Sequence, residues 1–398
     1  MPVWHDLTKE LRASGDIMVI GITQEQHPQR CELWAQWEQV DWPILWDPFN
    51  LTGSAAVPIA MAVDEHGVVQ NMRLQPQKFE QQFKQDFLAK EFPAPKDLTR
   101  RTAQHKHPQI QAMLHSKLDG QQWQKALAVL KTEAAPAAAK KAPQNAAHSA
   151  EQTAAAWFRL GVAQRMRYDS SHAHADDFQN ALQSWQQALK LNPGQYIWRR
   201  RIQQWGPKLD KPYPFYNWVS QAQMQLKKRG LTPIELPVPL AATASGGEEG
   251  AQPEAGVPLD NNNRVAIESA LAWQTPSPRN ATEPVSTVRV HLALRPDARH
   301  QVEWGDDVGA VEIWLRPMNG WQIEQNHLVL KAEPQLPKQR LQKVSFEVKR
   351  VQADANERVE AATKLQGTAY YYICIGADGE CTYLAQEFEI ELALPAGS

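Results

Sequence analysis

The sequence predicts a multidomain chain in which an α/β region, an all-helical region and a β region follow one another. Three observations favour this order. Apolar runs alternate with amphipathic stretches over residues 1–98, helical spacing of apolar residues dominates residues 105–230, and short alternating runs separated by turn residues begin at Val265. The length of 398 residues corresponds to about two to four domains.

Composition and charge disfavour several classes of protein. The chain has 42 Lys and Arg against 44 Asp and Glu, so it lacks the positive excess of a protein that binds nucleic acid through counterion release. No run approaches the roughly 20 apolar residues that span a bilayer, and residues 1–6 lack a signal-peptide pattern. Three cysteines (Cys31, Cys374 and Cys381) are too few for a four-thiolate zinc site, and we expect no metal or cofactor.

For residues 1–98 the sequence predicts helices packed on a sheet that has both parallel and antiparallel pairs of strands. Trp4, Leu7 and Leu11 show the helical spacing, and Gly67 stands in a hairpin turn where a positive φ is expected. The predicted elements are a helix over 2–14, a strand over 16–23, a helix over 28–40, and extended segments over 42–46, 57–64 and 68–74.

Five short motifs follow one another within residues 1–75. They are Met1-Pro2, Val19-Ile20-Gly21-Ile22, Trp42-Pro43-Ile44-Leu45-Trp46-Asp47-Pro48, Val57-Pro58 and Val63-Asp64-Glu65-His66-Gly67. In this order and spacing they resemble the thioredoxin-like thiol oxidoreductases of the TlpA and peroxiredoxin type. The resemblance implies a thioredoxin-like fold for residues 1–98, and it makes Pro58 the counterpart of the family's cis-proline.

The family's first strand and its Cys-x-x-Cys motif have no counterpart here, because Met1-Pro2 aligns just after them. A sheet that loses a central strand exposes an edge, so we expect a start further upstream rather than a truncated relic. Without this cysteine pair no thiol–disulfide exchange is assigned to the region. The peroxidatic cysteine of a peroxiredoxin would fall at the same position, which has no counterpart in this sequence. Cys31, on the second predicted helix, is interpreted as a half-buried structural thiol.

Residues 105–230 predict helical hairpins. A first pair covers 109–118 and 121–133, and a second pair carries Trp157, Leu160, Gly161, Ala181, Trp185, Ala188 and Pro193. The second set resembles the tetratricopeptide repeat, in which small residues let two helices cross closely. The resemblance implies a surface for a partner peptide or protein, whereas the apolar stripe itself is interpreted as core. We expect Arg199-Arg200-Arg201 to form a solvated helix face, with a groove lining as the alternative.

The last region predicts a β-sandwich after a linker. Residues 231–257 are dense in Pro, Gly and Ala, as in a flexible linker. Eight segments then have the length and spacing of strands: 265–273, 287–294, 301–304, 311–315, 327–331, 344–351, 370–374 and 387–392. This pattern predicts an immunoglobulin-like sandwich over residues 258–398.

Cys374 and Cys381 flank a predicted turn at Ala377-Asp378-Gly379. Two strands joined there would bring the Cα atoms of the cysteines within the range of about 4.4–6.8 Å that a disulfide requires. Three interpretations stay open at this point. The cysteines form an exposed redox-active disulfide, a structural disulfide of an extracytoplasmic domain, or two free thiols in a reducing compartment.

The motifs Tyr371-Tyr372-Ile373-Cys374 and Gly379-Glu380-Cys381-Thr382-Tyr383 resemble the N-terminal periplasmic domain of the transmembrane thiol:disulfide interchange reductases. The resemblance implies a location outside the cytoplasm and electron exchange with protein thiols or a thioredoxin-fold partner. We therefore expect a thioredoxin-family redox protein with Cys374 and Cys381 as its site. The alternative is a non-catalytic scaffold that binds partner proteins, and a peroxiredoxin-type antioxidant protein is a third candidate.

Overall fold

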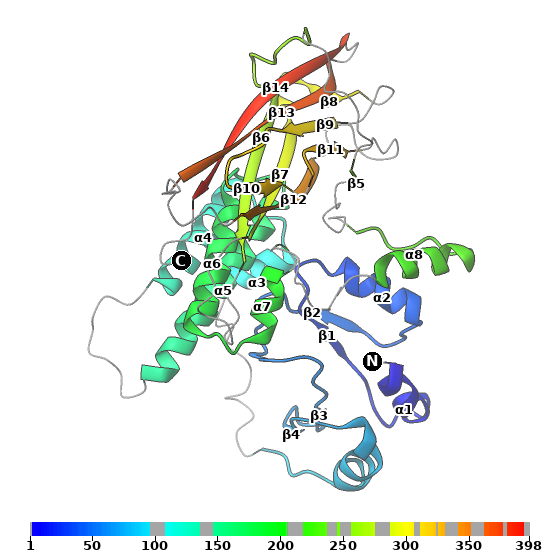
Figure 1. Cartoon of the computed structure of the whole chain (residues 1–398). Helices are drawn as coiled ribbons and strands as arrows, with labels where there is room; N and C mark the ends of the chain where they lie inside the picture. Colours follow the sequence, from blue (N-terminus) through cyan, green and yellow to red (C-terminus); the bar gives the residue numbers. More distant parts are fainter. Residues whose placement is uncertain are drawn as a thin grey trace. The chain divides into compact units, whose positions relative to one another are not determined.

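A computed structural model (Figure 1) describes residues 2–95, 108–135, 146–203, 205, 218–236, 245–246, 256–274, 287–305, 311–323, 325–330, 341–351, 362–376 and 380–393. Most of the predicted linker lies outside these residues. The chain forms two compact units: unit 1 comprises Met1–Ala163, Gln187–Arg201 and Pro214–Pro237, and unit 2 comprises Gln164–Gln186, Ile202–Tyr213 and Val238–Ser398. The described residues form helices and mostly antiparallel sheets, which confirms the predicted mixture of helical and β regions in its coarse form.

Unit 1 begins with the predicted alternation of helices and strands, although its strands are shorter than predicted. The elements are α1 (Pro2–Ala13), β1 (Gly21–Thr23), α2 (Gln29–Glu38), β2 (Ile44–Trp46), β3 (Ala62–Val63), β4 (Val69–Asn71), a 3-10 turn η1 (Pro76–Lys78) and a π-helix η2 (Glu80–Leu88). The apolar face of α1 packs against Phe79 and Phe83, as its helical spacing predicts. Gly67 has φ 74° in the β3–β4 turn.

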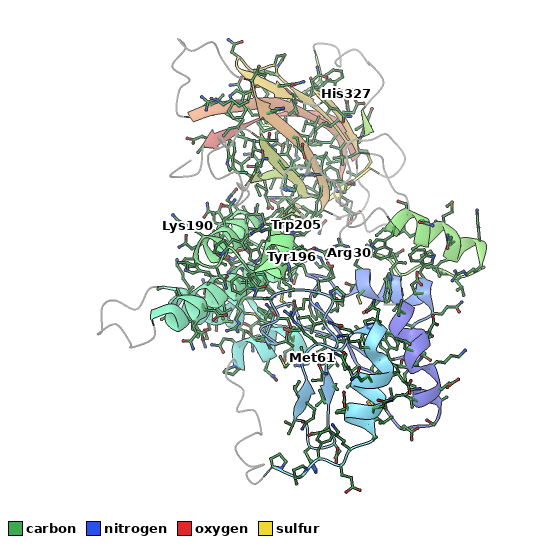
Figure 2. All side chains as sticks on the ribbon, turned by 60° about the horizontal axis from the view of Figure 1, so that its bottom comes forward. Arg30, Met61, Lys190, Tyr196, Trp205 and His327 are labelled. Atoms are coloured by element: carbon green, nitrogen blue, oxygen red, sulfur yellow. A yellow bond between two sulfur atoms is a disulfide. The ribbon has the colours of Figure 1, made fainter. Side chains whose placement is uncertain are left out.

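These strands form two separate two-stranded sheets where one sheet was predicted. β1 pairs in parallel with β2, and β3 pairs antiparallel with β4, but no described strand joins the two pairs. The expected continuous sheet is wrong because residues 16–20 and 57–61 have no strand alongside them in the described part of the chain. Apolar side chains are exposed as a result: Met18, Ile20, Ile22, Leu45, Val57, Met61 (labelled in Figure 2), Val63, Val69 and Met72.

The helical region contains α3 (Pro108–His115), α4 (Gly120–Ala134), α5 (Ala146–Tyr168), α6 (Asp177–Leu191), α7 (Tyr196–Gln203) and α8 (Trp218–Lys228). Asp119 begins α4 with a capping box, in which its carboxylate accepts the Gln122 N–H and the Gln122 side chain accepts the Asp119 N–H. Trp185 and Leu160 are buried, as predicted for the apolar stripe.

Arg201 is buried, so the expected solvated face over residues 199–201 is wrong at this position. Its guanidinium donates to the Gln26 side chain and to the carbonyls of Gln24 and Pro48, and it lies over the Phe158 ring. These oxygens and the ring replace water around the cation, which makes the burial tolerable. Charge patterning alone could not predict this, because the acceptors come from segments more than 150 residues away.

Unit 2 contains two antiparallel sheets around one apolar core. The first has the order β10-β12-β7-β6 and the second the order β14-β13-β9-β11-β5, with β8 also paired to β13 (Figure 1). Val290 and Phe346 of the first sheet and Ile313 and Ile373 of the second are buried in this common core. The bounds are β5 (Ser245–Gly246), β6 (Val265–Trp273), β7 (Thr287–Pro296), η3 (Ala298–His300), β8 (Val302–Trp304), β9 (Val311–Leu315), β10 (Trp321–Ile323), β11 (His327–Leu330), β12 (Gln342–Arg350), β13 (Ala362–Ile375) and β14 (Glu380–Ala393). All eight predicted strand segments overlap one of these strands.

A buried cluster of cationic and aromatic side chains lies within unit 2, where the end of α5 and the start of α6 contact β7. The Arg165 guanidinium lies 4.0 Å from the ring centroid of Trp205 and 4.4 Å from that of Phe178. His291 of β7 packs against Phe178, and its Nε2–H donates to the Trp205 carbonyl. Arg165 Nε donates to Asp169 at 2.9 Å, so the cation has both a carboxylate and aromatic faces around it.

The stability of unit 2 should fall as the pH drops below about 6.5, because of His291. Burial, and next the neighbouring Arg289, lower the pKa of His291 to about 3, so below pH 6.5 the unfolded chain takes up a proton that the folded chain does not. We expect this group to lower the free energy of unfolding by up to about 1.4 kcal/mol per pH unit. Urea unfolding at pH 7 and pH 5 should show a weaker pH dependence in His291→Gln.

His174→Gln serves as the control for this measurement, because His174 is an exposed histidine of the same unit. This variant should keep the wild-type dependence of unfolding free energy on pH. An unchanged dependence in His291→Gln would contradict the assignment.

Candidate functional site

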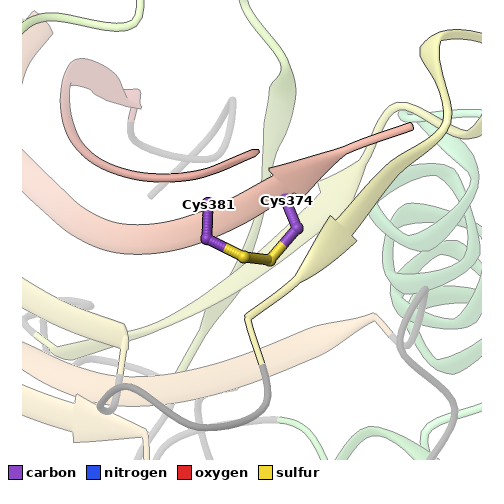
Figure 3. The surroundings of a disulfide bond; sticks show 2 residues. All are labelled: Cys374 and Cys381. Atoms are coloured by element: carbon purple, nitrogen blue, oxygen red, sulfur yellow. A yellow bond between two sulfur atoms is a disulfide. The ribbon is translucent and has the colours of Figure 1, made fainter. Parts of the chain in front are cut away.

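The two cysteines predicted to form the site face each other at the end of the β13–β14 hairpin. Cys374 and Cys381 are directly opposite in the strand register, and they are joined by a disulfide with Cα atoms 4.0 Å apart (Figure 3). This distance is shorter than the range expected from the sequence. It is close to the roughly 4.5 Å of a non-hydrogen-bonded antiparallel pair, in which facing residues come closest.

The two halves of the disulfide differ in their surroundings. Cys381 is exposed and belongs to β14, the outermost strand of its sheet. Cys374 is half-buried on β13, and Glu303 of β8 lies opposite it on the other side. Two residues after Glu303, Gly305 donates its N–H to the Tyr372 carbonyl. A solvent-borne reactant therefore meets Cys381 first.

Gly305 lies close beside the disulfide. An added Cβ there would lie 3.6 Å from Cys374 Sγ and 3.3 Å from Tyr372 Cβ. The backbone of Gly305 does not have a positive φ, so its conformation does not itself require glycine. A side chain here would instead press on Tyr372 Cβ, so glycine lets the backbone of residue 305 lie close beside Cys374.

Two tyrosines share the face of the sheet that carries the disulfide. Because side chains alternate along a strand, Tyr372 and Tyr383 point to the same side as the cysteines two residues away. Their ring centroids are 4.4 Å apart. Burial and the charge of Glu312 raise the pKa of Tyr383. Both rings therefore present aromatic surface next to the sulfurs.

Tyr371 points the other way and is fully buried in the core. Its hydroxyl donates to Asp260 at 3.0 Å or to Gln386 at 2.7 Å, and burial raises its pKa. These hydrogen bonds join β13 to β14 and to the segment before β6, and they fix the hairpin from its core side. Tyr371 therefore supports the site without contacting a reactant.

Pro58 and Cys31, which the sequence analysis also considered for thiol chemistry, belong to unit 1, whereas the disulfide belongs to unit 2. The Val57–Pro58 peptide bond is cis. Cys31 is a half-buried free thiol on α2, and burial raises its pKa although the Thr23 hydroxyl opposes this. A raised pKa disfavours the reactive thiolate, so Cys31 has the environment of a structural thiol.

Sequence reasoning assigned no role to four residues of the site. Tyr372 and Tyr383 could have been found, because each stands two residues from a cysteine and therefore shares its face of the strand. Glu303 and Gly305 carried no such signal, since only the pairing of β8 with β13 brings them to the disulfide.

No protein-family model matches the chain, and the comparison with curated proteins finds no match either. Among the described residues, no helix has the length and apolar character needed to cross a membrane. Within the same residues, no three metal-ligating side chains gather into a group. The chemistry of the site follows from its own geometry.

Loss of the disulfide should lower the stability of unit 2 moderately. The bond closes a loop with a sequence separation of 7, for which the chain-entropy relation gives about 2.5 kcal/mol. We expect urea unfolding of the Cys374→Ala/Cys381→Ala variant to show this loss relative to the oxidised wild type. Cys31→Ala should change the unfolding free energy of unit 2 by less than about 0.5 kcal/mol. An undiminished stability in the double variant would contradict the prediction.

Proposed function

We propose that this protein takes part in thiol–disulfide exchange through Cys374 and Cys381. The observation that carries the proposal is the exposure of Cys381 at the end of a hairpin, on the outermost strand of its sheet. Exchange needs a sulfur that an incoming thiolate can reach in line with the existing bond, and exposed disulfides are the labile ones. The resemblance of both cysteine motifs to the periplasmic reductase domain supports the same function.

The proposed reaction begins with attack of a partner thiolate on Cys381 Sγ. A bond forms between the partner sulfur and Cys381, the Cys374–Cys381 bond breaks, and Cys374 leaves as a thiolate that takes up a proton from water. A second thiol of the partner then attacks its own sulfur in the mixed disulfide. Cys381 is released as a thiolate, the partner is oxidised by two electrons, and the hairpin is left with two thiols. The partner class is a protein dithiol, such as that of a thioredoxin fold.

The experiment that tests this function uses the full oxidised chain and a reduced thioredoxin-fold protein. Alkylation followed by mass spectrometry should show both cysteines of the folded chain becoming free thiols within minutes. The Cys374→Ser variant should form a mixed disulfide through Cys381 with the oxidised partner, and Cys381→Ser should form several-fold less. Reaction that occurs only after urea unfolds the chain would refute the proposal, because a purely structural disulfide behaves in that way.

A second candidate function, a module that binds partner proteins without chemistry, is favoured by the exposed apolar side chains of unit 1. Met18, Leu45 and Met72 are all more than half exposed. Monomeric proteins rarely leave many large apolar residues uncovered on neighbouring elements. Binding of this kind would persist in the Cys374→Ala/Cys381→Ala variant, whereas exchange would be lost, so a binding measurement on that variant separates the two functions.

A further inference from the structure

One carboxylate lies beside the disulfide without an ion pair among the described residues. Glu303 faces Cys374 across the β8–β13 pair, and it is half-buried while its neighbours Val302 and Trp304 are buried in the core. Because paired residues on adjacent strands point to the same side, the Glu303 carboxylate shares the face of the sheet that carries the sulfurs.

Two acidic residues further along β14 differ from Glu303 in having a cationic partner. Glu387 pairs with Arg316, and Glu389 pairs with Lys364. Glu312, which lies opposite Tyr370 on the same face, interacts with Nε2 of His327 at 2.9 Å (His327 is labelled in Figure 2). Among the residues that the structure describes, Glu303 therefore lacks the basic partner that each of these three carboxylates has.

A positive group would be stabilised at this end of the sheet for two independent reasons. The electrostatic attraction of Glu303, which lies opposite Cys374, acts on any charge that reaches the disulfide from its exposed Cys381 side. The faces of Tyr372 and Tyr383, which lie on the same side, attract cations through their ring quadrupoles. A bare thiolate is repelled by the same carboxylate, so a cation next to the attacking sulfur offsets that repulsion.

We infer that the disulfide selects thiol partners that carry a positive charge beside the reactive sulfur, with Glu303 as the residue that determines this specificity. The partner is then a protein segment in which Lys or Arg adjoins the reacting cysteine. Such a cation also lowers the pKa of the partner's own cysteine, which raises the fraction present as the attacking thiolate. This inference rests on the proposed exchange function and concerns the same site.

The test uses the full oxidised chain and three small thiols of similar size. These are cysteamine (cationic), 2-mercaptoethanol (neutral) and 3-mercaptopropionate (anionic), each at equal thiolate concentration and low salt. The rate at which the Cys374–Cys381 bond opens is followed by alkylation and mass spectrometry. Each rate is divided by the rate of the same thiol with an uncharged linear disulfide, which removes the intrinsic reactivity of the thiol.

In the wild type we expect cysteamine to react faster than 3-mercaptopropionate by about tenfold after this correction. Glu303→Gln should lower that ratio about fivefold, and 0.5 M salt should have a similar effect because it screens the charge. Tyr383→Leu should lower the ratio about twofold. Glu391→Gln removes an exposed carboxylate from the far end of β14, roughly 33 Å from Cys381 at the strand repeat, and should leave the ratio unchanged.

The possible failures of the two proposals are distinguishable. A ratio that is the same in the wild type and in Glu303→Gln, or an anionic thiol that reacts fastest, would overturn the inference and leave the exchange function standing. A bond that none of the three thiols opens in the folded chain would overturn the exchange function, and the inference with it. Glu303→Gln is nearly isosteric, and its urea unfolding curve shows whether the fold is retained.

Discussion

Arg165→Ala should lower the free energy of unfolding of unit 2 by about 3 kcal/mol, the cost of breaking a buried ion pair from one side. Arg165 is 1% exposed. Its guanidinium lies on the rings of Trp205 and Phe178, and its Nε donates to Asp169. Alanine would leave a cavity against the two rings, and it would remove the Arg165 cation from the Asp169 carboxylate, to which Lys343 also lies 3.7 Å away.

Arg165→Met separates the two contributions, because methionine fills most of the volume without the charge. We expect it to lose about 1–2 kcal/mol, since apolar replacements of buried ionic groups are often tolerated. Arg299→Ala is the matched control: its side chain is 86% exposed and pairs with Asp297 on the surface, so the unfolding free energy should stay at the wild-type value. Urea unfolding followed by far-ultraviolet circular dichroism measures all three. Equal stabilities for Arg165→Ala and Arg299→Ala would contradict the prediction.

The cluster around Arg165 also shows which parts of the fold local sequence patterns predict. Alternation of apolar and polar residues located the strands of unit 2, because each strand buries one face in a common core and the period of two is local. The environment of Arg165 depends instead on Trp205 and on His291 of β7, which approach from distant parts of the chain. No pattern within a short window carries that information, so a buried arginine cannot be recognised from its neighbours in sequence.

The same difference between local patterns and non-local contacts is seen in the disulfide hairpin and in unit 1, the two regions whose motifs resemble thiol oxidoreductases. The spacing of Cys374 and Cys381 around a turn was sufficient to predict that they face each other, because a hairpin is a local structure. Glu303 and Gly305 required the non-local pairing of β8 with β13. In unit 1, β-branched runs predicted strands, but whether those strands joined one sheet depended on neighbours that local propensity does not specify.

Gly367→Val should destabilise unit 2 by about 3 kcal/mol, because the sheet has no room for a side chain at this position. An added Cβ would lie 2.5 Å from Cζ of Phe388, the residue opposite on β14, and 2.9 Å from the carbonyl oxygen of Trp314 on β9. Gly367 does not have a positive φ, so the requirement for glycine arises from packing rather than from backbone conformation. Gly367→Ala should show a smaller loss of about 2 kcal/mol.

A second substitution, at Phe388, identifies which contact is responsible, and Gly194→Ala serves as the control. The Phe388 ring can rotate, whereas the Trp314 carbonyl is fixed within the sheet, so Gly367→Ala/Phe388→Leu should recover about 1 kcal/mol relative to a simple sum of the single changes. Gly194→Ala places a methyl where the nearest atom is 3.8 Å away and should alter stability by less than about 0.5 kcal/mol. Full recovery in the double variant would mean that the ring alone excludes a side chain. A Gly367→Val protein as stable as the wild type would mean that β9 and β13 can separate without cost, which is incompatible with the continuous pairing from Gly367 to Tyr370.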